Sequence, residues 1–145
     1  MIELINLDHW VGEIKDFCPI FNTVLETIIM SYDNLDFYET PMALIYMVGD
    51  NSKPNPLMNS ISQYNKNEVC VEIAIRSTVN QNDRLNNYDS KLIKECRLQV
   101  LNALIGWTPL DCDAPVEHST GELLIKDNFI IWKDTFTTSN YLTQP

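Results

Sequence analysis

Residues 68–76 read Glu-Val-Cys-Val-Glu-Ile-Ala-Ile-Arg, and this stretch decides the fold class. Its odd-numbered positions, from Val69 to Ile75, are all β-branched aliphatic residues, while the positions between them are mixed. An alternation with a period of two is typical of a β-strand, because successive side chains point to opposite faces of a sheet. We therefore expect a strand over 68–76 with one apolar face that a second layer must cover.

A second strand is expected upstream. Residues 42–48 are continuously apolar, so we expect a strand covered on both faces that stops at Gly49-Asp50-Asn51. Residues 50–66 are polar and contain Pro54 and Pro56, which exclude a helix and predict a long loop. Long loops in compact domains are usually functional or disordered. The candidate interface residues on this loop are Lys53, Leu57, Met58, Ile61 and Tyr64.

The clearest helix is expected over 89–105, followed by Gly106 at a position that suits a left-handed C-terminal cap. Its inner face carries Leu92, Ile93, Cys96, Val100, Ala103 and Leu104. The last third predicts three strands over 115–119, 122–126 and 129–138, joined by short turns. In the final strand, Ile130, Trp132, Asp134 and Phe136 share one face, and we expect Trp132 and Phe136 to be largely buried against the helix.

The N-terminal region predicts two helices. Asp8 is expected to cap the first, whose apolar face carries Trp10, Val11, Ile14 and Phe17 and which Pro19 ends. The second is expected to start near Asn22, with Leu25, Ile28, Ile29 and Tyr32 on one side. The whole order predicts an α+β two-layer fold, with a mainly antiparallel sheet and helices on one face, in a single domain over 1–145.

The composition limits the partners. Twenty acidic against ten basic residues give a formal charge of −10, which repels nucleic-acid phosphates and anionic membranes. No apolar run is long enough to span a membrane, so no membrane partner is expected. The cysteines are scattered singly and are expected to be buried and reduced, which favours assembly in the cytoplasm of a cell. They are Cys18, Cys70, Cys96 and Cys112.

No catalytic or metal-binding motif is visible, so we expect neither an enzyme nor a cofactor. Four glycines leave no room for a nucleotide-binding glycine motif, and the cysteines and histidines lack metal-ligand spacing. His118 follows Glu117, but adjacent strand residues point to opposite faces, so His118 is predicted to be an ordinary surface residue.

Three segments in the C-terminal half carry a resemblance. The first, 98–109, ends in Gly-Trp-Thr-Pro; the second, 115–124, contains Glu117 and Gly121-Glu-Leu-Leu; the third, 130–136, contains Trp-Lys-Asp-Thr-Phe. Together they resemble the tail terminator (tail completion) family of Mu-like phages and prophages, although His118 stands where that family usually has a tyrosine. The matching residues include Gly106, Trp107, Pro109, Glu117, Gly121, Trp132, Asp134 and Phe136. We expect them to be structural, knitting the helix end onto the strands.

The resemblance implies a virion protein that forms a six-fold ring on the head-proximal end of the tail tube. Such a ring ends tube polymerisation and joins the tail to the neck. The implied partners are its own copies, the tail tube protein and a neck or connector protein, with a sheath protein as a further candidate. DNA would pass through an acidic bore without specific binding, and the candidate bore residues are Asp33, Asp36, Glu39, Asp83 and Asp89. The alternatives are another connector ring such as a head–tail stopper, or a small acidic immunity-like or antitoxin-like binding protein.

Overall fold

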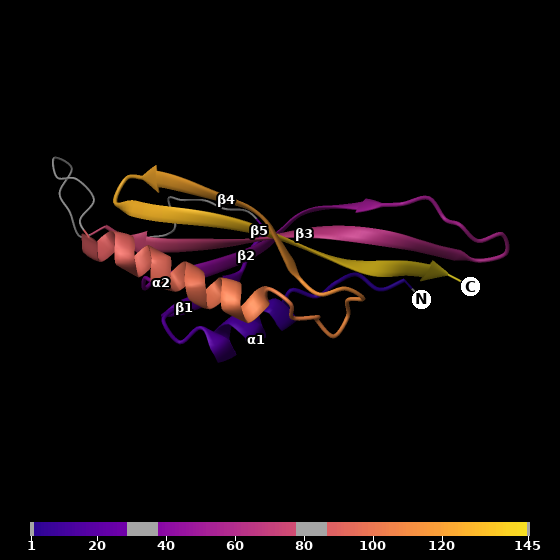
Figure 1. Cartoon of the computed structure of the whole chain (residues 1–145), viewed down its shortest axis with the longest axis horizontal. Helices are drawn as coiled ribbons and strands as arrows, with labels where there is room; N and C mark the ends of the chain where they lie inside the picture. Colours follow the sequence, from indigo (N-terminus) through magenta and orange to yellow (C-terminus); the bar gives the residue numbers. More distant parts are fainter. Residues whose placement is uncertain (1, 29–37, 78–86, 145) are drawn as a thin grey trace.

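The structure is a computed structural model that describes residues 2–28, 38–77 and 87–144. The elements are α1 (Asp8–Phe17), β1 (Thr23–Glu26), β2 (Met42–Ser52), β3 (Ile61–Arg76), α2 (Asn87–Leu104), β4 (Glu117–Lys126) and β5 (Phe129–Gln144). The strands form one sheet in the order β1-β2-β3-β5-β4, antiparallel except for the β1–β2 pair. Both helices cover the same face of this sheet (Figure 1), which confirms the predicted α+β class.

The main core lies between the helices and the sheet. The alternating residues from Val69 to Ile75 are all buried there, opposite Trp10 and Ile14 of α1. The α2 side chains that complete this layer are Cys96, Val100 and Leu104, each with no exposed surface. The apolar face of the strand, with a period of two, and the apolar face of the helix, with a period of 3.6, therefore pack together in one core.

A smaller core occupies the opposite face of the sheet. It contains Met42, Leu44, Ala74, Phe129 and Ile131, all nearly or fully buried. The first four residues of β2 are thus covered on both faces, as the apolar run predicts. Met47 and Val48 are exposed, so the burial on both faces ends before the run does.

Strands β2, β3 and β5 continue past the helices as a three-stranded arm (Figure 1). The β3–β5 pairing is unbroken from Ile61–Gln144 to Arg76–Phe129. We name residues 49–68 and 137–144 the extension, and the helix-covered remainder the body. The turn between β2 and β3, residues 53–60, lies at the far end of the extension, and we name it the hairpin tip.

The interior of the extension is polar. Asn65, Asn67 and Asn140 are buried on the same face of the sheet as Val69, and their amide groups are bonded to one another over 2.8–3.3 Å. Asn140 Nδ2 also donates to the carbonyl of Glu3 at 3.1 Å. The segment before α1 therefore lies against this face and supplies an acceptor to a buried donor.

The second N-terminal helix is a wrong prediction. Residues 23–26 form the edge strand β1, which pairs in parallel with β2, and Asn22 and Thr23 donate their N–H groups to the carbonyl of Pro41. A short apolar run with a β-branched residue can satisfy either period, and only the neighbouring strand selects the extended form. The rest of the predicted helix, including Ile29 and Tyr32, lies outside the described residues.

The predicted long loop over 50–66 is also wrong, because both ends of this segment belong to strands and only residues 53–60 lie outside them.

The last third contains two strands, β4 and β5, instead of the three that were predicted. The break expected at Ser119 is a register irregularity inside β4, and β5 runs on to Gln144. Polar strands such as these are stabilised by pairing and not by apolar burial, so a hydrophobic pattern does not reveal them.

Three residues are placed differently from the prediction. The N-cap of α1 is Leu7, and the N–H of Asp8 donates to Asn6 Oδ1 at 2.9 Å, so Asp8 is not the cap. Phe17 is 62% exposed instead of facing the core. Asp89, a candidate bore residue, is buried in the first turn of α2 and accepts a hydrogen bond from Ser77 at 3.2 Å.

Candidate functional site

Asp134 is the centre of a buried charge cluster on the helix-facing side of β5. Its carboxylate has no exposed surface and accepts hydrogen bonds from Arg97 Nε and Nη2, both at 3.0 Å. Trp132 Nε1 donates to the same carboxylate at 3.2 Å, and His118 Nε2 lies 2.7 Å from it. These bonds satisfy a charge that would otherwise be very costly to bury.

Gly121 is fixed by this cluster. A Cβ atom at Gly121 would lie 2.8 Å from Arg97 Nη2, 3.0 Å from Asp134 Oδ1 and 3.1 Å from Trp132 Nε1. The Arg97 guanidinium also stacks over the Trp132 ring, 4.4 Å from its centroid. The backbone of β4 therefore approaches the charge cluster at a distance that only glycine permits.

A second cluster of large aromatic side chains anchors the end of α2. Trp107 packs edge-on against Trp10 at 5.6 Å, and Trp10 lies 6.4 Å from Phe136. Gly106 has a φ of 86°, and its N–H donates to the carbonyl of Val116 while Val116 N–H donates to the carbonyl of Trp107. The loop after α2 is thereby closed onto the helix end, with Pro109 buried within it.

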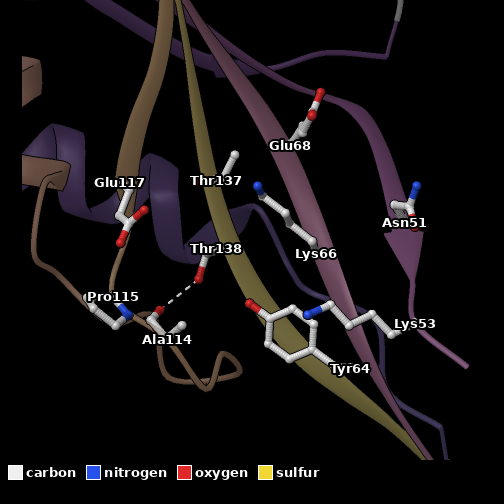
Figure 2. A pocket seen from close by; sticks show the side chains of 10 residues that line it. All are labelled: Asn51, Lys53, Tyr64, Lys66, Glu68, Ala114, Pro115, Glu117, Thr137 and Thr138. Atoms are coloured by element: carbon white, nitrogen blue, oxygen red, sulfur yellow. Dashed lines mark hydrogen bonds between the residues drawn. The ribbon is translucent and has the colours of Figure 1, made fainter. Parts of the chain in front are cut away.

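Glu117 does not join either cluster. It is exposed on the opposite face of the sheet, where it lines a groove of about 490 Å³ at the base of the extension. Figure 2 shows Lys53 and Lys66 reaching into this groove from one side, with Glu117 on the other. The lining mixes both charges with Thr and Asn side chains, and the groove is open to solvent.

The hairpin tip is held in shape by Asn55. Its Nδ2 donates to the carbonyls of Leu57 and Ser60, and its Oδ1 accepts from Ser62 N–H at 2.9 Å. Met58, at the end of the tip, is 99% exposed. The predicted interface residues are divided by the structure: Leu57 and Met58 lie on the tip, Ile61 and Tyr64 belong to β3, and Lys53 lies over the Tyr64 ring at 5.1 Å.

The prediction for His118 is wrong, and Arg97 was not among the predicted site residues, whereas Trp10 lies in the core as its place in the helical apolar stripe predicts. His118 points inward to Asp134 instead of being an ordinary surface residue: it pairs with Phe136 on the helix-facing side of the sheet, while Glu117 lies on the opposite side. The signal for Arg97 was an aspartate on the apolar face of a strand, which requires a cation from the covering helix.

All four cysteines are buried and free. Burial raises the pKa of the Cys18 and Cys70 thiols from 9.0 to about 11, and that of Cys96 and Cys112 to about 12. Thiols with such pKa values are poor nucleophiles at neutral pH. Within the described part of the chain, no group of three or more His, Cys, Asp or Glu side chains could hold a metal ion, and no helix is long and apolar enough to cross a membrane.

The charge cluster pairs within the fold, whereas the exposed apolar tip of the protruding hairpin is typical of a surface that contacts another molecule. The comparison with known families agrees: the family model described as phage tail terminator protein matches residues 3–145. The chain therefore belongs to the phage tail terminator family, and its role is structural, in the tail of a phage virion. No individual curated protein matches the chain significantly.

Proposed function

We propose that the protein caps the head-proximal end of a phage tail tube, where it ends tube polymerisation and forms the joint to the neck. The observation that carries the proposal is the family match over 3–145. It is supported by an arm that projects beyond the helical layer and ends in exposed apolar side chains, because such a surface suits docking to other tail components.

The capping protein is a ring of six copies, assembled in the cytoplasm of the host cell, with the tube protein on one side and the neck protein on the other. A ring requires two different complementary patches on each copy, related by a rotation that closes. The net charge of −10 supports an acidic bore, since a surface without excess Lys and Arg releases DNA readily. Glu39 is exposed and remains a candidate for the bore. Asp33, Asp36 and Asp83 lie outside the described residues.

The decisive experiment removes the gene from the phage or prophage that encodes it and examines the particles by electron microscopy. Loss of the cap is expected to give tails of uncontrolled length that carry no heads, and supplying the gene in trans is expected to restore both features. In a purified system, adding the protein to polymerising tube subunits should arrest tube growth. Tubes that keep their normal length in its absence would contradict the proposal.

The same experiment separates the other candidates. A head–tail stopper would leave tails of normal length that fail to join heads. An immunity-like or antitoxin-like protein would leave the particles unchanged and would bind one basic protein as a soluble pair.

A further inference from the structure

Charge is distributed unequally between the extension and the body. The two acids of the extension, Asp50 and Glu68, lie at its base. Beyond them, residues 51–67 and 137–144 carry two lysines and no acid, which leaves eight Lys and Arg residues against all twenty Asp and Glu residues for the rest of the chain. The hairpin tip adds Leu57 at 48% and Met58 at 99% exposure. The distal extension is therefore a basic and apolar arm on an acidic protein.

A surface of the opposite chemistry lies on the body, where α1 meets the loop after α2. It is a shallow groove of about 440 Å³ whose lining includes one histidine, His9, and no lysine or arginine. We name it the α1 groove, and its principal lining residues are Asp8, Gly12, Glu13, Asp16, Trp107 and Leu110. Leu110 is 89% exposed beside these acids. The groove thus offers three carboxylates and an uncovered apolar side chain.

Gly12 is the feature of this groove that the isolated chain does not explain. Glycine in a helix interior is destabilising relative to alanine. A Cβ atom built on Gly12 would meet nothing within 4 Å, so the fold itself does not require its absence. A glycine in open space on a helix allows another chain to approach the backbone closely, so this face of α1 is accessible to a partner.

The carboxylates of the groove also favour a cation. Burial raises the pKa of Glu13 above its usual value, and repulsion from Asp16 raises it further. An approaching ammonium group would relieve that repulsion and stabilise both charged forms. The ammonium group of Lys53 lies at the start of the hairpin tip, whereas Lys66 lies in the groove at the base of the extension.

We propose that the hairpin tip of one copy docks into the α1 groove of the next copy, with Met58 over Gly12 and Lys53 against Glu13 and Asp16. The occupant is a second copy because one chain carries both complementary surfaces. The tip lies at the end of the long axis, away from α1 (Figure 1), so a rigid arm does not reach its own groove. The two patches differ, and the contact is therefore head-to-tail, as a closed ring requires. It also offsets the repulsion between copies that each carry ten excess negative charges. This inference rests on the ring of the proposed function.

The test is a chain that carries both Met58→Cys and Gly12→Cys, oxidised under mild conditions and run on a non-reducing gel. Both sites are open and the four native cysteines are buried, so the new thiols react selectively. Head-to-tail docking is expected to give a ladder of multimers, whereas either substitution alone gives a dimer at most. The matched control pairs Met58→Cys with Tyr88→Cys, an exposed position on α2, and is expected to give no ladder.

A charge exchange tests the same contact without cross-linking. Lys53→Glu is expected to weaken self-association by about tenfold or more in sedimentation, and Glu13→Lys in the same chain is expected to restore it. An absent ladder, an equal ladder in the Tyr88 control, or no rescue by Glu13→Lys would overturn the inference. If the protein forms rings but the double-cysteine chain gives no ladder, the docking of the hairpin tip is wrong while the proposed ring still stands. A ladder from a protein that does not limit tube length would instead overturn the capping function.

Discussion

Strand β3 passes through both regions of the molecule, and the two halves are stabilised differently. In the body, Val69, Val71 and Ile73 are buried under the helices. In the extension, the positions on the same face are Asn65 and Asn67, which are equally buried but bonded through their amides. The pairing with β5 continues through both halves without interruption. Continuous backbone pairing therefore joins an apolar region to one whose interior is made of hydrogen bonds.

The difference in chemistry implies a difference in stability. A fully buried aliphatic side chain contributes about 1.5–3 kcal/mol, whereas a hydrogen bond contributes only about 0.5–1.5 kcal/mol net. The extension is therefore expected to open locally at a lower free energy than the body. Such a segment is suited to completing its contacts in an assembly, where a partner supplies the apolar burial that the isolated chain lacks.

The largest difference in the free energy of unfolding is expected between two variants, Phe136→Ala in the body and Tyr141→Ala in the extension. Phe136 is fully buried, so its truncation should lower the free energy of unfolding by about 3–5 kcal/mol. Tyr141 is 49% exposed and packs only edge-on against Tyr64, so its truncation should cost less than about 1.5 kcal/mol. Urea denaturation of both variants checks this, and equal losses would remove the distinction between the regions.

The next largest difference in stability is expected between alanine variants at two glycines, because Gly121 is in crowded surroundings and Gly12 is in open space. Gly121→Ala forces a methyl group into the charge cluster and is expected to destabilise the protein by about 1–3 kcal/mol. Gly12→Ala meets no atom and is expected to stabilise the isolated chain by about 0.5–1 kcal/mol. Thermal denaturation measures both shifts. A neutral Gly121→Ala would mean that Arg97 and Asp134 can separate without loss.

Asn140→Ala tests the polar interior of the extension. The change removes the bond to the Glu3 carbonyl and the acceptor of the Asn65 and Asn67 amides, at an expected cost of about 1–2 kcal/mol. Hydrogen exchange should show the loss in residues 61–67 and 138–144, with β3 protection unchanged from Val69 onward. Faster exchange that spreads equally into the body would show that the two regions unfold as one unit.

The smallest effect at neutral pH is expected from the buried thiols of the body. Their folded-state pKa values of about 11 to 12 exceed the ordinary value of 9.0, so the unfolded chain releases thiol protons first as the pH rises. Stability should be unaffected below about pH 8 and should decline as the pH rises from about 9 toward 11. Urea midpoints across this range test the sign, with a Cys96→Ala variant as the comparison. A rise in stability over the same range would contradict the assignment.

Strong apolar periodicity and local residue preferences predicted three features of the body correctly. The alternation around Val71, the amphipathic stripe of α2 and the left-handed position of Gly106 all lie where the residues indicate, because each reflects a local preference. The boundaries of β2, β3 and β5 could not be found in the same way. Asn, Ser and Thr have no clear strand period, and the strands they form are stabilised by partners distant in sequence.

The candidate site shows the same division. Phe136 and Trp132 were both predicted to be largely buried; Phe136 is fully buried, and Trp132 is partly buried. The convergence of Gly121, Trp132 and Asp134 on Arg97 was not predicted, because no pattern along the chain reveals that α2 crosses β4 and β5 at that point. His118 was predicted to be an ordinary surface residue because Glu117 points to the opposite face, and that alternation holds. Its partner is Asp134 on the neighbouring strand, which no pattern around His118 reveals.

The sequence by itself determined the class of fold, the acidic character of the chain and its resemblance to the tail terminators, since each follows from residue types and their order. Tertiary structure alone decided which carboxylates are buried, which strands continue beyond the helices, and where the exposed apolar side chains gather. The physical reason is that burial and charge pairing depend on distances between residues far apart in the chain. Asp134 and Arg97 illustrate this: 37 positions apart, they are 3.0 Å apart in the fold.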